Sequence, residues 1–125
     1  MNALAVTYGI FIWAMATVIV YFIGGALFEG GLGTILILYS LTVPAIWGLL
    51  QAFWRVTQAF PEDRLRTGVL IATPGLLLDA FVMLGQPVVF ADFSDVATRS
   101  FAGWLLWAYG VACVVALRAH PGRQP

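Results

Sequence analysis

Residues 3–28 read ALAVTYGIFIWAMATVIVYFIGGALF, a stretch without a charged side chain or a histidine. A helix of about 20 mostly apolar residues crosses a hydrocarbon core of roughly 30 Å, so this stretch is long enough to span a bilayer. Three further runs, apolar over most of their length, follow at about 34–54, 67–86 and 95–118. We therefore predict an all-α integral membrane protein, a four-helix bundle with four transmembrane spans.

The composition of the whole chain agrees with a membrane protein. Of the 125 residues 62% are hydrophobic and only 10% are charged, and the mean hydropathy is +0.94. Soluble domains of this size have about a quarter of their residues charged. The formal net charge is zero, so no nucleic-acid partner is expected. We assign residues 1–118 to the four-span bundle and 119–125, which are polar and proline-rich, to a flexible cytoplasmic tail.

The arginines predict which ends of the spans face the cytoplasm. Arg55, Arg64 and Arg66 border the second connection, and Arg118 and Arg123 follow the fourth run, whereas the first connection has no basic residue. Because cytoplasmic loops are enriched in basic residues, both termini are predicted to be cytoplasmic. Aromatic residues near the predicted span ends fit either interfacial belts or lipid-facing positions: Tyr8, Phe28, Phe53, Trp54, Phe60, Phe90, Phe93, Phe101 and Trp104.

Two local patterns mark where helices end and begin. Gly30, Gly31 and Gly33 follow the first span directly, which is typical of a tight turn. Ser94 and Asp95 precede the fourth apolar run. A serine hydroxyl accepts a hydrogen bond from free amides at a helix start, and an acid suits the positive end of the helix dipole. We expect the fourth helix to begin there.

One charged side chain, Asp79, falls well inside a span. Counted from Thr67 at 1.5 Å per residue, it lies roughly 18 Å from the cytoplasmic end, near mid-membrane. An ionised carboxylate exposed there costs about 2.5–3.5 kcal/mol or more, so Asp79 is predicted to face the bundle interior. The helical pattern agrees with this prediction. Small, flexible or polar residues share the helix face of Asp79, namely Ala72, Gly75, Met83 and Gln86. Large apolar residues lie on the opposite face, namely Leu77, Leu78 and Phe81.

Other polar side chains lie at similar depth in the antiparallel spans. Their hydroxyls can donate hydrogen bonds, and only Asp79 has a carboxylate to accept several. We predict a polar layer that forms a candidate proton or ligand site: Asp79, Tyr109, Thr17, Tyr21, Thr42 and Thr73.

Two prolines inside the spans, Pro44 and Pro74, are candidate helix kinks. Each removes one internal hydrogen bond and crowds the carbonyl four residues earlier, at Ser40 and Leu70. Kinks beside a polar layer can frame a site. Proline is also common in transmembrane helices, where it often only shapes packing.

Asp79 itself allows two interpretations. In the first, it is a proton or cation site, the usual role of an acid inside a membrane. In the second, it is a permanently protonated acid, or one held by tyrosine and threonine hydroxyls, that keeps the bundle together. No arginine or histidine lies at its depth to neutralise it.

Most catalytic chemistries lack their residues in this sequence. The single histidine, His120, lies in the tail beyond the last span, so no base stands beside a nucleophile. Cys113 is the only cysteine and fits helix packing. Neither a metal-ligand cluster nor a phosphate-binding glycine loop is present. We therefore expect a protein that is not an enzyme and that needs no metal and no cofactor.

Two segments resemble a family of small four-span bacterial membrane proteins of unknown function. They are TPGLLLDAF at 73–81 and FAGWLLWAYG at 101–110. The resemblance implies a bacterial inner (plasma) membrane setting and no particular substrate. Length and span number are also similar to the small multidrug resistance transporters, but the essential acid of that family lies in the first helix, where this chain has none before Glu29.

These observations lead to two main hypotheses about function, because a third, an integral-membrane enzyme acting on lipid or quinone, lacks catalytic partners. The first is a non-enzymatic structural or accessory protein of the lipid bilayer, either a homo-oligomer or a subunit of a larger membrane complex. The second is a small proton-coupled transporter or permeation unit that uses Asp79 and acts as a homodimer, because four spans alone rarely enclose a solute pathway.

Overall fold

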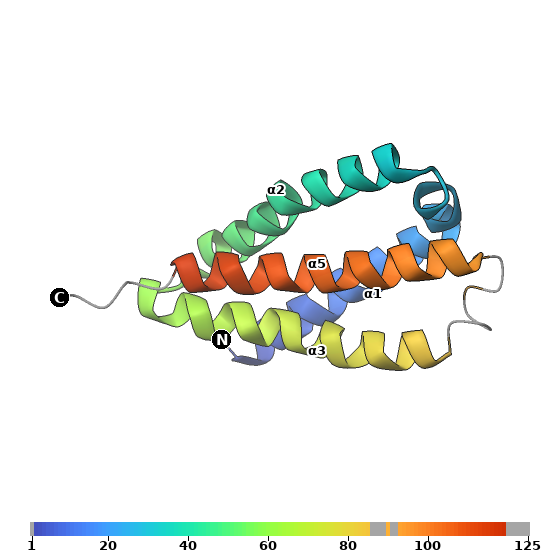
Figure 1. The fold of residues 1–125 in the computed structure, drawn as a ribbon. Helices are drawn as coiled ribbons and strands as arrows, with labels where there is room; N and C mark the ends of the chain where they lie inside the picture. Colours follow the sequence, from blue (N-terminus) through green and yellow to red (C-terminus); the bar gives the residue numbers. More distant parts are fainter. Residues whose placement is uncertain (1, 86–89, 91–92, 120–125) are drawn as a thin grey trace.

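Four long helices make up the chain in the computed structural model, which describes residues 2–85, 90 and 93–119. A short 3-10 helix, η1, leads into the third long helix. Gln86 and residues 120–125 of the predicted tail lie outside the described residues. The elements, labelled as in Figure 1, are α1 (Asn2–Phe28), α2 (Leu32–Thr57), η1 (Pro61–Asp63), α3 (Arg64–Leu84) and α5 (Asp95–Ala119).

All four helices of the described residues are long and apolar enough to cross a membrane, so the structure has the four candidate spans that the sequence predicts. The chain is therefore a multi-pass membrane protein with an all-α four-helix fold. Helices satisfy their backbone hydrogen bonds internally, as lipid requires. Two helices extend beyond the apolar runs from which they were predicted: α2 continues to Thr57, and α3 already begins at Arg64.

The helices run up and down in a single bundle. Figure 1 shows the start of α1, the connection between α2 and α3, and the last turns of α5 at one end. The turn between α1 and α2 and the start of α5 lie at the other end. The cytoplasmic location of the termini stays a prediction from the arginines.

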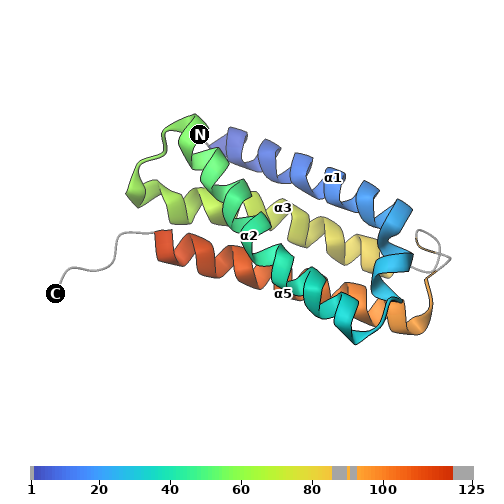
Figure 2. The same cartoon turned by 90° about the horizontal axis from the view of Figure 1, so that it is seen from above.

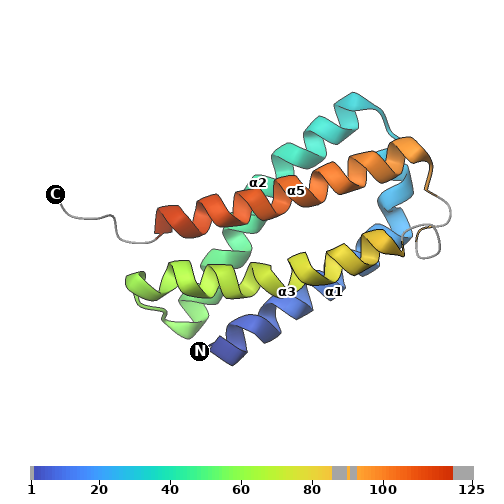
Figure 3. The ribbon, with the colours of Figure 1, turned by 60° about the horizontal axis from the view of Figure 1, so that its bottom comes forward.

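The order of the helices around the bundle differs from their order along the chain. Helix α1 packs mainly on α3, α3 on α5, and α5 on α2, while α1 and α2 contact each other less. Figure 3 shows α5 between the first half of α2 and α3, while the second half of α2 passes behind α5. Seen from above, α2 crosses the other helices obliquely (Figure 2).

Two apolar clusters hold the ends of the bundle together. The Trp54 cluster, near the start of α1, consists of Ala5, Leu50, Phe53, Trp54, Ala59, Ile71 and Ala112. The Phe28 cluster, near the other end, consists of Val20, Phe28, Phe90, Ala97 and Phe101. Phe28, Phe53, Trp54, Phe90 and Phe101 are buried, so the lipid-facing alternative was wrong for these five aromatic residues. Their location at the depth of the membrane interface stays a prediction.

Small residues allow the helices to approach closely at specific points. A Cβ atom added to Gly9 in α1 would overlap the backbone carbonyl of Ile71 in α3. A Cβ atom at Gly68 would lie 2.7 Å from the Cβ atom of Ala116 in α5. Such contacts let helix backbones pack in a membrane, where burial of apolar surface provides little driving force.

The predicted turn and helix start take the expected form. Gly31 has a φ angle of 90°, a region that a residue with a side chain rarely adopts, and it precedes the first residue of α2. The Ser94 hydroxyl accepts a hydrogen bond from the backbone N–H of Ala97 at 3.1 Å, which confirms the cap of α5. The carboxylate of Glu29 accepts a 3.3 Å hydrogen bond from the backbone N–H of Ser94 and so links the two connections at this end.

Both prolines lie inside continuous helices. Pro44 belongs to α2 and Pro74 to α3, and each helix continues past its proline for at least two turns. Nearby threonine hydroxyls donate to carbonyls one turn earlier, Thr42 to Leu38 at 2.7 Å. Kinks at these positions stay a prediction.

Candidate functional site

Asp79 lies inside the bundle, on the face that the sequence pattern predicts. Its side chain is only 7% exposed. Ala72 and Gly75 line the same cavity as Asp79, whereas Leu77 and Phe81 are exposed on the opposite face of α3. A carboxyl group at this position avoids the acyl chains because the helix directs its apolar face outward.

Two hydrogen-bond donors from other helices hold the carboxylate. The indole Nε1–H of Trp13 in α1 donates to Oδ1 at 2.9 Å, and the hydroxyl of Tyr109 in α5 donates to Oδ2 at 2.5 Å. Gly75, one turn before Asp79, makes room for the tyrosine, since a Cβ atom there would lie 2.6 Å from its hydroxyl. We call Asp79, Trp13 and Tyr109 the Asp79 clasp; it joins three of the four helices.

The clasp can hold the acid in either protonation state. An indole N–H can only donate, but a tyrosine hydroxyl can donate to a carboxylate or accept from a carboxylic acid. In the part of the chain that the structure describes, the one ion pair joins Arg66 to Asp63 at 3.5 Å, near the start of α3. Asp79 thus has hydrogen bonds but no cationic partner among these residues.

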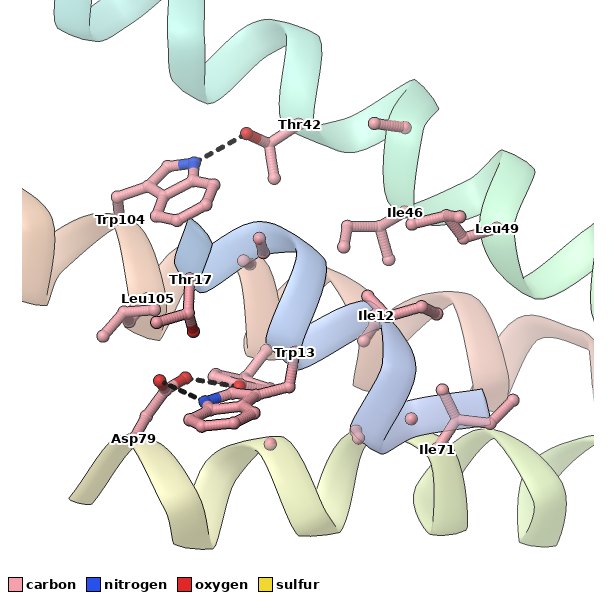
Figure 4. Close-up of a pocket in the computed structure, with 18 of the residues that line it drawn as sticks. Ile12, Trp13, Thr17, Thr42, Ile46, Leu49, Ile71, Asp79, Trp104 and Leu105 are labelled. Carbon is pink, nitrogen blue, oxygen red and sulfur yellow. Dashed lines mark hydrogen bonds between the residues drawn. The ribbon is translucent and has the colours of Figure 1, made fainter. Parts of the chain in front are cut away.

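A cavity of about 220 Å³ lies in the middle of the bundle and reaches Asp79. All four helices contribute to its wall, which is mostly aliphatic and aromatic, as Figure 4 shows. It extends between the two apolar clusters, because members of both line it. Its main apolar residues are Ile12, Ala16, Val20, Ile46, Leu49, Ile71, Phe101, Leu105 and Ala112.

A second polar pair lies on the α2 side of the cavity. Trp104 in α5 donates its indole N–H to the Thr42 hydroxyl at 2.8 Å (Figure 4). That hydroxyl donates in turn to the backbone carbonyl of Leu38. The pair ties α2 to α5, and the indole N–H of Trp104 is fully occupied by it.

Thr17 supplies a free hydroxyl to the cavity. It lies one helical turn after Trp13 in α1, and Figure 4 shows both Thr17 and Asp79 among the residues around the cavity. No hydrogen bond of the Thr17 hydroxyl is found within residues 2–85, 90 and 93–119. It is therefore available to a bound molecule near the Asp79 clasp.

The structure brings together four of the six residues predicted for the polar layer and leaves two outside. Asp79, Tyr109, Thr17 and Thr42 all line the cavity. Tyr21 is 59% exposed and packs against Phe22 and Phe90. Thr73 is exposed and donates to the carbonyl of Val69 at 2.6 Å. Depth along the helices was estimated from residue counts, but the rotation of each helix decided which side chains point inward.

Sequence reasoning missed the two tryptophans of the site. Trp13 holds the acid, and Trp104, predicted for an interfacial or lipid-facing position, lines the cavity. A usable signal was present, because Trp13 and Thr17 are four residues apart and so share one helical face. A tryptophan buried away from water usually finds an acceptor for its N–H, and Asp79 is the strongest acceptor inside the spans.

Comparison with known proteins identifies a family but no activity. A family model described as a family of unknown function, DUF5367, matches residues 27–120. The match includes Asp79, Thr42 and Tyr109, while Trp13 and Thr17 precede it. Neither a curated protein nor a solved structure shows a significant match to the chain.

Proposed function

Since this chain belongs to the DUF5367 family, whose function is unknown, we propose its function from the interior of the bundle. We propose a small non-enzymatic membrane protein that binds a solute in the cavity and a proton at Asp79, and so works as a proton-coupled transporter or permeation unit. The observation that carries this proposal is a cavity that meets a buried acid without a cationic partner among the described residues.

The energetics of a buried acid favour exchange at this site. A carboxylate in the middle of a membrane is costly when ionised and unpaired, by about 2.5–3.5 kcal/mol or more. Binding a proton or a positively charged group removes that cost. A proton and a solute that compete for one carboxylate affect each other's affinity by the same factor, which is the basis of coupling.

The wall of the cavity supports a role in binding rather than catalysis. Its polar side chains are one carboxyl, three hydroxyls and two indoles, from Asp79, Thr17, Thr42, Tyr109, Trp13 and Trp104. The titratable groups described in the wall, Asp79 and Tyr109, are hydrogen-bonded to each other, so the wall offers no base beside a separate nucleophile. The residues described around the cavity include no histidine, cysteine or second acid.

The test is flux in proteoliposomes. Vesicles containing a pH-sensitive dye and the purified protein would be challenged with a panel of small amines, amino acids, sugars and carboxylates. We expect at least one class to move protons with the wild type, and the Asp79→Asn protein to behave like protein-free vesicles while keeping its helix content. Glu62→Gln, the same change at an exposed acid in η1, is the matched control. Flux that is unchanged in Asp79→Asn would overturn the proposal.

A structural or accessory role is the second candidate. The observation that favours it is that both oxygens of Asp79 already accept hydrogen bonds from other helices. In that case Asp79→Asn unfolds the bundle, and the wild type moves no solute of the panel.

We further propose the setting in which the protein works. The arginine distribution supports cytoplasmic termini, and the resemblance noted from the sequence supports a bacterial inner membrane. Broad exposed apolar faces suit the lipid bilayer and contact with other copies or with a larger membrane complex. Light scattering of the detergent-solubilised particle measures its mass; a monomer would count against a homodimer.

A further inference from the structure

We propose that the cavity binds a small amphiphilic amine in its ammonium form, with a body about the size of one aromatic ring and its charged nitrogen beside Asp79 and Thr17. This inference rests on the proposed function, because it names the class of solute that the same site would take. Three properties of the cavity carry it: its size, its charge and the kind of hydrogen-bonding groups it offers.

The size of the cavity limits the ligand. A dry apolar cavity of roughly 150 Å³ in another protein holds one benzene molecule. The cavity here measures about 220 Å³, enough for one ring with a short polar chain.

The charge of the cavity selects a cation. Asp79 is the only carboxylic acid among the described residues of its wall, and no cation pairs with it in that part of the chain. Each carboxylate oxygen accepts one hydrogen bond from the clasp and retains a further lone pair. An anionic ligand would place a second negative charge in an apolar enclosure, which is strongly unfavourable.

The free polar groups favour a ligand that donates hydrogen bonds. The indole N–H groups of Trp13 and Trp104 are already used, by Asp79 and Thr42 respectively. The groups that remain are the carboxylate of Asp79, which accepts, and the hydroxyl of Thr17, which can accept or donate. An ammonium group with N–H bonds satisfies both acceptors, whereas a quaternary ammonium satisfies neither by hydrogen bonding.

Aromatic side chains complete the site. Trp13, Phe101, Trp104 and Tyr109 all contribute to the wall. The faces of such rings attract a cation, and their surfaces suit an apolar ring. An amphiphilic amine therefore finds a favourable partner for each of its two parts.

The experiment measures binding to the full-length protein in detergent by calorimetry, with three probes of nearly equal shape. They are 2-phenylethylamine, which is an ammonium at neutral pH, the neutral propylbenzene, and the anionic 3-phenylpropionate. We expect the amine to bind at least about tenfold more tightly than either, because a hydrogen bond to a charged group contributes that much. Equal binding of the amine and propylbenzene would overturn the inference.

Variants locate the bound amine. Asp79→Asn should weaken amine binding by about tenfold or more, and Glu62→Gln should leave it unchanged. Ala108→Leu, which adds a larger side chain to the cavity wall and leaves the three clasp residues unchanged in sequence, should abolish binding, and it serves if Asp79→Asn does not fold. Amine binding that survives in Ala108→Leu would overturn the inference.

The result is separable from the test of transport. If the amine binds at Asp79 but no compound of the panel moves protons, the inference stands and the proposed function fails. If another class of solute drives Asp79-dependent flux and the amine does not bind, the inference fails and the proposed function stands.

Discussion

Replacing Tyr109 with phenylalanine removes one hydroxyl from the Asp79 clasp and keeps the ring. The hydroxyl donates to an acid that is 7% exposed, and it lies against Gly75, so the ring itself has no reason to move. A hydrogen bond to a charged group contributes about 1.5–3 kcal/mol, whereas a neutral one between transmembrane helices averages about 0.6 kcal/mol. The free energy of unfolding should therefore fall by about 1.5–3 kcal/mol where Asp79 is ionised, and by about 0.6 kcal/mol where it is protonated.

The assay is reversible unfolding by sodium dodecyl sulfate in mixed micelles, followed by circular dichroism at acidic and at alkaline pH. Tyr21→Phe is the matched control, because this tyrosine also belongs to the bundle but is 59% exposed, without a hydrogen bond in the described part of the chain. The cost of Tyr109→Phe should exceed that of the control and should grow toward alkaline pH. If the two variants cost the same at every pH, the clasp contributes nothing and our reasoning about Asp79 is refuted.

Two further predictions concern the packing of the bundle. Gly9→Ala should lower the free energy of unfolding by about 1–3 kcal/mol, because the added Cβ atom meets the backbone of α3. Gly48→Ala is the control. A Cβ atom at Gly48 has no atom of another element within 4 Å, so this change should be neutral or stabilising. Equal effects in the same unfolding assay would contradict the close approach of α1 to α3. Thr67→Val should cost about 1–3 kcal/mol, since it leaves the buried N–H of Trp54, now bonded to the Thr67 hydroxyl at 2.9 Å, without an acceptor. A loss below the scatter of repeated measurements would show that another group takes over as acceptor.

The number of spans and the inward direction of Asp79 follow from the sequence. Lipid cannot satisfy backbone polar groups, so long uncharged runs have one solution, the helix. A charge in lipid is costly, and small residues lie on the same helix face as Asp79, so the sequence predicts that this side chain faces the bundle interior. In the structure, Asp79 is buried. The cap at Ser94 is equally local, because it depends on a hydroxyl three residues before a free amide.

The partners of Asp79 were decided only by the tertiary structure. Tyr21 and Thr73 have the depth of the polar layer but point away from the cavity, while Trp13 points into it. A helix that is apolar on all sides has no amphipathic stripe from which its rotation about its own axis can be predicted. Rotation follows instead from contacts between helices distant in sequence, such as Gly9 of α1 against the backbone of α3, which no local pattern contains.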